Sequence, residues 1–155
     1  MAKILDEKLQ EAIEWVPHEG QKLVLQSNKR DLTIAAGVRW GKSQLAGYIG
    51  FKNLLADNQR IWIVSLSYNM AEKIFDYVLD FAAKWDKRML KGLSNRPFPR
   101  LEVKEWNSWI ECKSAENEES LMGEELDLVL LDEASRMKSD IWNRYLMARL
   151  ASRIG

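Results

Sequence analysis

Cysteine and histidine are almost absent from this chain of 155 residues, which contains one of each. Cys112 has no partner within the chain, so an internal disulfide is excluded and a reducing compartment is the environment that the sequence favours. His18, as the single histidine, excludes a multi-histidine metal site. Because Cys112 lies in a predicted hairpin, we expect a buried core residue there rather than a nucleophile.

An excess of one charge and a long apolar run are also missing. The 23 basic and 23 acidic residues give a formal charge of zero, so global charge predicts no nucleic-acid partner. No run approaches the roughly 20 apolar residues of a membrane helix, and residues 1–6 lack the apolar stretch of a signal peptide. We therefore expect no membrane contact. The composition, 46% apolar and 30% charged, is typical of a globular domain, and we expect one domain over residues 1–155.

Apolar runs of strand length alternate with segments of helical periodicity. Strands are predicted over residues 32–36, 60–66 and 126–133, with a hairpin formed by residues 101–103 and 109–111. Helices are predicted over residues 4–16, 18–27, 42–56, 70–85 and 140–152. This alternation, with strands that are apolar on both faces, predicts a three-layer α/β domain in which helices flank a mostly parallel central sheet.

A phosphate-binding pattern follows the first predicted strand, where residues 36–43 read "AGVRWGKS". The spacing is that of G-x-x-x-x-G-K-[ST], with Ala36 at the usual place of the first glycine. In this pattern, backbone N–H groups and a helix N-terminus surround a phosphate, the lysine reaches the outer phosphates and the hydroxyl ligates Mg²⁺. The motif predicts that ATP and Mg²⁺ are held by Gly37, Val38, Arg39, Trp40, Gly41, Lys42 and Ser43. The alternative is an incidental turn with an exposed lysine.

An acidic pair ends the most apolar strand candidate, "LDLVLLDEAS". An ATP site of this kind needs one carboxylate to hold Mg²⁺ and another group to act on the attacking water. Asp132 is predicted to serve the metal and Glu133 the hydrolysis, because a carboxylate that is not neutralised by the cation can polarise water. The alternative is that both residues only cap the next element.

These stretches together resemble the large terminase subunit of tailed bacteriophages. The resemblance rests on "AGVRWGKS", "VPHEGQ", "IVSLSYNMAEKIF" and "ESLMGEELDLVLLDEAS", and runs from about Trp15 to the end of the chain. It implies an additional-strand P-loop ATPase domain that drives double-stranded DNA into a capsid. It also implies a homo-oligomeric ring on the capsid portal, a small terminase subunit as partner, and the host cytoplasm as location.

The resemblance also implies roles for single residues. Gln21 would recognise adenine, since an amide can donate and accept together. Arg39 would contact or sense phosphate, for which a guanidinium is well shaped. Lys42 and Ser43 would bind phosphate and Mg²⁺, with Asp132 on the metal and Glu133 in catalysis. The alternatives are that Gln21 is a solvated helix residue and that Arg39 points outward.

Two features depart from the family pattern. Met122 stands where family members often carry an arginine, the candidate finger offered to a neighbour's ATP, and methionine cannot stabilise phosphoryl charge. Arg136, Arg144 and Arg149 could substitute, and the sequence does not select among them. The family continues into a further strand with a coupling motif, a linker and a nuclease domain. Because this sequence ends at Gly155, we expect a truncated ATPase portion without a nuclease site.

One stretch is locally basic and predicts contact with DNA phosphates. Its members are Lys84, Lys87, Arg88, Lys91, Arg96, Arg100 and Lys104. The alternative is a solvated loop balanced by the acidic residues within 116–125.

The leading interpretation is a Mg²⁺-dependent ATPase that couples ATP turnover to translocation of double-stranded DNA. One alternative is another nucleic-acid-dependent P-loop ATPase, such as a helicase fragment. The other is a truncated domain that binds nucleotide or partner proteins without turnover.

Overall fold

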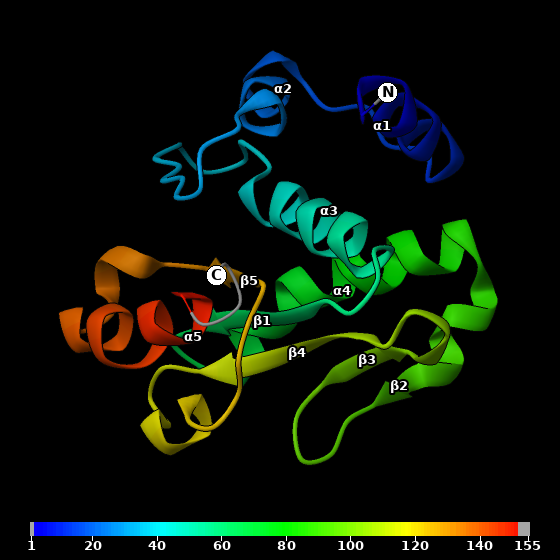
Figure 1. Cartoon of the computed structure of the whole chain (residues 1–155). Coiled ribbons are helices and arrows are strands. Elements are labelled where there is room, and N and C mark those ends of the chain that lie inside the picture. Colours follow the sequence, from blue (N-terminus) through cyan, green and yellow to red (C-terminus); the bar gives the residue numbers. More distant parts are fainter. Residues whose placement is uncertain (1, 152–155) are drawn as a thin grey trace.

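A five-stranded sheet with helices on both faces forms the centre of the molecule (Figure 1). The computed structural model describes the backbone of residues 2–151 and the side chains of residues 6–151. The strands are β1 (Arg60–Ser65), β2 (Leu93–Ser94), β3 (Arg100–Val103), β4 (Ser108–Ser114) and β5 (Leu128–Leu131). The α/β class predicted from the sequence is confirmed.

The helices follow the predicted segments closely. They are α1 (Ala2–Ala12), α2 (Glu19–Gln26), α3 (Lys42–Leu54), α4 (Tyr68–Trp85) and α5 (Met147–Ala151). A π-helical segment, η5 (Ile141–Leu146), leads directly into α5, so the last predicted helix is helical but irregular, and its residue 152 lies outside the described range. Short 3-10 helices lie at Lys87–Gly92 (η1), Lys104–Trp106 (η2), Glu118–Leu121 (η3) and Ala134–Arg136 (η4). Among the described residues, none of the helices combines the length and apolarity needed to cross a membrane.

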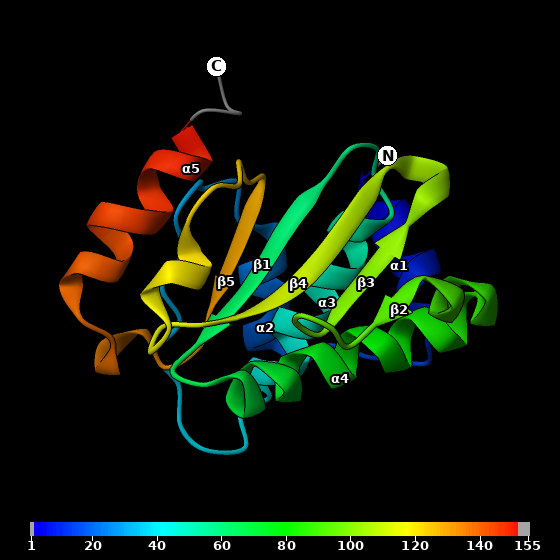
Figure 2. The same cartoon turned by 90° about the horizontal axis from the view of Figure 1, so that it is seen from below.

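The strands lie in the order β2-β3-β4-β1-β5, which Figure 2 shows from below. β1 is parallel to both β4 and β5, whereas β3 is antiparallel to β4 and to β2. The pairs Ser65↔Ser114 and Val64↔Leu131 show that the parallel strands end at one common edge. The predicted hairpin is confirmed as β3 and β4, and its turn closes through Asn107 in the left-handed conformation (φ 52°).

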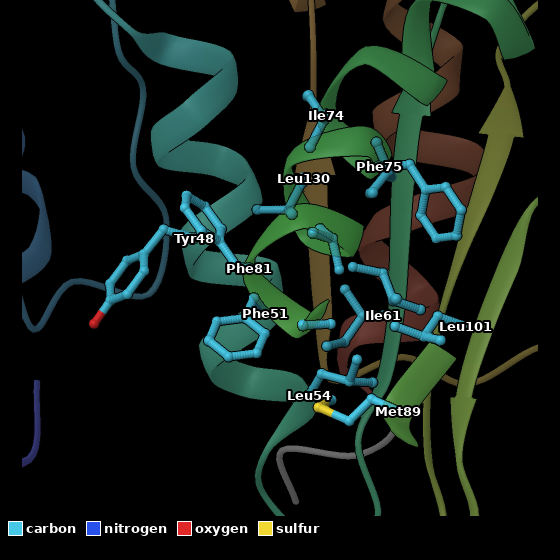
Figure 3. Close-up of a cluster of buried hydrophobic side chains, with 14 of the residues drawn as sticks. Tyr48, Phe51, Leu54, Ile61, Ile74, Phe75, Phe81, Met89, Leu101 and Leu130 are labelled. Carbon is cyan, nitrogen blue, oxygen red and sulfur yellow. The ribbon is translucent and has the colours of Figure 1, made fainter. Parts of the chain in front are cut away.

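Two apolar clusters cover the two faces of the sheet. The first lies between the sheet and helices α3 and α4, where Phe51, Ile61 and Phe81 are buried (Figure 3). The second contains Trp62 and Val64, the alternate residues of β1, packed with residues of η5 such as Ile141. β1 is therefore buried on both faces, as expected for the middle of a parallel arrangement. Cys112 is fully buried in the first cluster, which confirms its predicted core position.

The strand predicted over residues 32–36 is wrong. This segment has no regular secondary structure and joins no described strand, and Leu32 is 49% exposed. An apolar run favours a strand only where a neighbouring backbone supplies hydrogen-bond partners. β5, the last strand in the order, pairs with β1 on one side and not with residues 32–36.

Candidate nucleotide-binding site

The loop before α3 has the backbone shape of an anion-binding turn. Arg39 (φ 68°) and Gly41 (φ 88°) both adopt the left-handed conformation, and Trp40 N donates to Gly37 O at 3.4 Å. α3 begins at Lys42, and its N-cap is Gly41, which has no side chain to cap the first N–H groups. These N–H groups, together with the positive end of the helix dipole, therefore remain available to an anion.

The side chain of Lys42 folds back along this loop. Its Nζ donates to the carbonyl oxygen of Ala36 at 2.7 Å, and the side chain is exposed. The ammonium group thus lies against the loop that precedes α3. From there it can reach a phosphate bound by the backbone N–H groups.

Asp132 lies at the common edge of the parallel strands. Its N–H donates to Val64 O at 2.9 Å, which extends the β5 ladder by one residue, and its Oδ2 accepts a hydrogen bond from Ser65 Oγ at 3.3 Å. Burial raises the pKa of the Asp132 carboxyl, and the neighbouring charge of Glu133 raises it further. The Ser65 hydroxyl and the Lys42 ammonium lower that pKa. The positive charge of Lys42 therefore acts on Asp132 from the loop before α3.

Glu133 has a different environment from its neighbour. It is exposed, and it adopts the left-handed conformation (φ 55°) immediately before η4. Left-handed backbone costs free energy in a residue other than glycine, and such residues are concentrated at functional sites. The two adjacent carboxylates therefore differ, one half-buried and hydrogen-bonded, the other open to solvent.

The oxygen atoms available here fit Mg²⁺. A carboxylate at Asp132 and a hydroxyl at Ser43 are the hard donors that this ion prefers, and its other ligands are usually water and substrate phosphates. Among residues 6–151, no group of three or more histidine, cysteine or acidic side chains could hold a metal by itself. The donor set thus suits an ion that arrives with a phosphate ligand.

Gln21 connects α2 to the phosphate loop. Its side chain is 3% exposed, its Oε1 accepts from His18 N at 3.0 Å, and its Nε2 donates to Gly41 O at 3.2 Å. The alternative of a solvated helix residue is therefore excluded. Recognition of adenine by Gln21 stays a prediction, because both ends of its amide bind backbone groups in this structure.

Several predicted residues lie apart from these contacts. Val38 is 94% exposed and Arg39 is also exposed. Met122 is exposed at the start of the segment that leads to β5. Among the arginines proposed in its place, Arg136 lies in η4, three residues after Glu133, whereas Arg149 O accepts from Leu126 N near the opposite edge of the sheet.

The remaining alternative finger, Arg144, lies in η5 above the ring of Tyr145, with 5.5 Å from Cζ to the ring centroid. Tyr145 in turn donates to Glu118 at 3.1 Å and belongs to the second apolar cluster. Arg144 therefore lies beside the segment that covers this face of the sheet. Arg136 is therefore the alternative that shares the edge with Asp132.

The basic stretch does not form one surface. Because β3 runs antiparallel to β4, Arg100 lies opposite Glu111, toward the edge that carries Asp132, whereas Val103 lies opposite Ser108 at the other end. Arg96 lies in the loop before β3, while η1 and Lys104 flank the opposite edge. Three members also form ion pairs with acidic side chains: Lys84 with Asp80, Arg88 with Asp86, and Arg100 with Glu102 and Glu111.

Two surface hollows lie away from the phosphate loop. One lies between α4 and residues 95–99, and Glu72 and Asp76 contribute to its lining. The other lies between α1 and the start of α2, and its lining includes Glu7, Glu11 and Glu14. Carboxylates repel a triphosphate, so neither hollow competes with the loop as a phosphate site.

Ser65 and His18 are site residues that reasoning from the sequence missed. Ser65 is a small polar residue at the end of an apolar strand, and parallel strands carry their sites at this end. His18 precedes Gln21 by three residues, which is the spacing of a capping box with histidine in place of serine or threonine. Both signals are visible in the sequence, but their partners are distant along the chain.

Comparison with known proteins supports the resemblance read from the sequence. No protein-family model matches the chain. It is 26% identical to the large terminase subunits of Thermus phage G20c and Thermus virus P23-45, over 96% of this chain and 34% of each relative. The chain thus spans about a third of the length of the curated relatives it matches.

Solved structures with the same fold include the large terminase ATPase domain of Thermus phage P74-26. A point-mutant form superposes with a TM-score of 0.81 at 24% identity, over 96% of this chain and 66% of that one. The unaltered domain gives a TM-score of 0.78, again at 24% identity. The chain therefore shares the fold of the large terminase ATPase domain, and the predicted likeness to large terminase subunits is confirmed.

Proposed function

We propose that this chain binds and hydrolyses ATP at the common edge of its parallel strands, as the ATPase portion of a viral DNA-packaging motor. The main observation is geometric: Asp132 accepts from Ser65 at the common edge of the parallel strands, and Lys42 Nζ lies on the loop before α3, where it donates to Ala36 O. This supports a site in which the amine of Lys42 would bind phosphate and the carboxylate of Asp132 would bind the metal. The similarity to large terminase subunits supports the motor role.

Each group in this arrangement has a distinct task. The N-terminal N–H groups of α3 and the Lys42 ammonium bind the phosphates. Ser43 and Asp132 would hold Mg²⁺, which when bound neutralises charge on the phosphate oxygens. Asp132 must be ionised for this task, and the Ser65 hydroxyl favours its charged form.

Glu133 is the group that would act on the attacking water. Its carboxylate is adjacent to Asp132 and exposed, so it can accept a proton or orient a water molecule. The left-handed backbone at Glu133 turns the chain sharply after β5. We infer that the strain is retained because it directs this carboxylate away from Asp132.

The motor role extends the proposal to partners. Double-stranded DNA, further copies of the chain in a ring on a capsid portal, and a small terminase subunit are expected by analogy with the large-subunit relatives, as is the host cytoplasm. For DNA contact, the exposed basic residues are better candidates than those in ion pairs. Lys91, Arg96 and Lys104 are such residues, although they lie at different edges of the sheet.

Replacement of Glu133 by glutamine tests the enzymatic assignment. Glu133→Gln keeps the shape of the side chain but removes its basicity, so ATP affinity should stay within about threefold while multiple-turnover hydrolysis falls at least 100-fold. Glu119→Gln, at another exposed glutamate, is the matched control and should hydrolyse ATP at the wild-type rate. Undiminished hydrolysis by Glu133→Gln would reject the assignment. Binding without turnover by the wild type would favour a nucleotide-binding domain instead.

A further inference from the structure

The N-terminus of α2 is joined to the phosphate loop by a single imidazole. His18 Nδ1 faces the N–H groups of Gly20 at 3.1 Å and Gln21 at 3.4 Å, and His18 Nε2 lies 2.8 Å from Trp40 O. Because two N–H donors point at Nδ1, this nitrogen accepts and the ring proton resides on Nε2. The imidazole therefore caps α2 with one nitrogen and donates to the phosphate loop with the other.

A second bond from α2 reaches the next peptide of the loop. Gln21 Nε2 donates to Gly41 O, and the edge of the His18 ring meets the face of Trp40 at a centroid distance of 4.7 Å and an angle of 85°. The fit is close, because a Cβ on Gly41 would lie 2.7 Å from Gln21 Nε2, and a Cβ on Gly20 would lie 2.9 Å from the Trp40 ring. We call His18 and Gln21, with these two bonds to the loop, the α2 clamp.

The clamp controls the direction of two N–H groups. A peptide unit is planar and trans, so its C=O and its N–H point in opposite directions. When His18 binds Trp40 O, the N–H of Gly41 points to the other side of the chain, and when Gln21 binds Gly41 O, the same holds for the N–H of Lys42. These N–H groups lie where the loop enters α3, which is where a phosphate would bind.

We propose that His18 and Gln21 are positioning residues that hold the phosphate loop in its anion-binding form. The inference rests on the proposed function, since it concerns the same phosphate site. Without the clamp, the Trp40–Gly41 peptide can rotate and present its carbonyl oxygen to the phosphate, which repels it. The Gly41–Lys42 peptide keeps one further support, because Gly41 O also accepts from Leu45 N at 3.0 Å. The clamp recognises no base, so its loss should weaken binding of any triphosphate, with or without adenosine.

His18→Asn separates the two tasks of the imidazole. Asparagine is among the best N-caps, so α2 should persist, but its side chain is too short to cap and also reach Trp40 O. We expect the dissociation constants of inorganic tripolyphosphate and of a non-hydrolysable ATP analogue, measured by titration calorimetry, to rise together by roughly fivefold. The KM for ATP should rise similarly, while kcat stays within about twofold of wild type. The lost loop contacts affect phosphate binding equally in the ground state and the transition state, so the chemical step is unchanged.

Two further variants test the second bond of the clamp and control for a general loss of stability. Gln21→Met retains volume but cannot donate to Gly41 O, and should weaken tripolyphosphate binding by roughly threefold, less than His18→Asn, because Leu45 N still donates to Gly41 O. Asp86→Ala removes the cap of η1 at the opposite edge, where Asp86 accepts from Arg88 N, and should lower the melting temperature without changing either dissociation constant.

The outcomes distinguish failure of the clamp from failure of the site. Wild-type affinity for tripolyphosphate in both His18→Asn and Gln21→Met would overturn the clamp while leaving the nucleotide site intact. A loss confined to the ATP analogue would also overturn it, and would favour adenine recognition by Gln21. If the wild-type chain binds neither ligand, the proposed function itself fails.

Discussion

The hydroxyl of Ser65 donates to the carboxylate of Asp132 across neighbouring strands, with 3.3 Å between Oγ and Oδ2. Ser65 is fully buried at the end of β1, and Asp132 follows the end of β5. The bond opposes the effect of burial on Asp132, because a donor to a carboxylate favours its charged form. A small polar residue thus keeps a half-buried acid ready to bind a cation.

Ser65→Ala should shift the pH dependence of catalysis. Loss of the hydroxyl raises the pKa of Asp132 further, so a higher pH is needed to ionise the carboxylate that holds Mg²⁺. We expect the acidic limb of the kcat/KM profile to move to higher pH, with little change at high pH. Ser120→Ala, at an exposed serine that bonds Asn117 O, is the control. Superimposable acidic limbs for the Ser65 variant and the wild type would contradict the prediction.

Asp132→Asn should stabilise the fold while it abolishes Mg²⁺-dependent turnover. The folded chain binds a proton at Asp132 more tightly than the unfolded chain, since burial and Glu133 raise its pKa. Stability therefore falls as the pH rises from the unfolded pKa through the raised folded pKa, and the full cost is present above the folded pKa. Asparagine carries no charge, so the variant should melt higher than wild type at neutral pH.

The pH dependence of the melting temperature provides the check. The advantage of Asp132→Asn should shrink as the pH falls through the raised pKa of folded Asp132, and should vanish below about pH 3, where the wild-type carboxyl is protonated in both states. Added Mg²⁺ and ATP should raise the melting temperature of the wild type but not of the variant. A variant that melts lower than wild type at neutral pH would show that the Asp132 charge is not destabilising.

Lys42→Ala should remove ATP binding. The ammonium group is the cation that the loop itself supplies to the outer phosphates, and alanine leaves their charge without this partner. We expect at least a 100-fold rise in the dissociation constant, as is typical for loss of a group that compensates charge in a site. Lys138→Ala, at another exposed lysine, is the control and should bind normally. Equal ATP affinity in the two variants would place the phosphates elsewhere.

Glu133→Asn should raise stability and remove hydrolysis together. Asparagine tolerates the left-handed conformation better than glutamate, so the free energy of unfolding should rise by roughly 0.5 to 1 kcal/mol in urea titration. The amide cannot act as a base, so multiple-turnover hydrolysis should be lost. A stability below wild type would show that the backbone at Glu133 (φ 55°) carries no strain.

Phe81→Ala should strongly destabilise the fold. The Phe81 ring contacts the rings of Trp15, Tyr48 and Phe51, with centroid distances from 5.9 to 6.2 Å. Its loss leaves a cavity between α3 and α4, and should cost about 3 to 5 kcal/mol of unfolding free energy. Leu23→Ala, at a side chain that is 71% exposed, should stay within about 0.5 kcal/mol of wild type.

Local patterns in the sequence predicted most of the elements and the chemistry of the site. Helical periodicity located α3 and α4, an apolar run located β1, and the spacing of Gly41, Lys42 and Ser43 located the phosphate loop. These features depend on neighbours within a few residues of each other, so they can be read from one stretch at a time.

The prediction failed where partners lie far apart in the chain. Residues 32–36 have the apolar character of a strand, yet the ladder bonds that define a strand must come from another segment. The basic stretch looks continuous as a sequence, but the antiparallel turn of β3 on β4 sends its members to two edges of the sheet. The strand prediction thus had the right composition and the wrong placement, whereas DNA contact by the basic stretch stays a prediction.

The sequence by itself determined the apolar frame and the residues that we propose for the chemistry, which are Lys42, Asp132 and Glu133. The tertiary structure alone decided that Ser65 supports Asp132 and that His18 and Gln21 hold the phosphate loop. The physical reason is range: periodicity and spacing act between near neighbours, whereas hydrogen bonds between segments 20 to 70 residues apart exist only once the chain has folded.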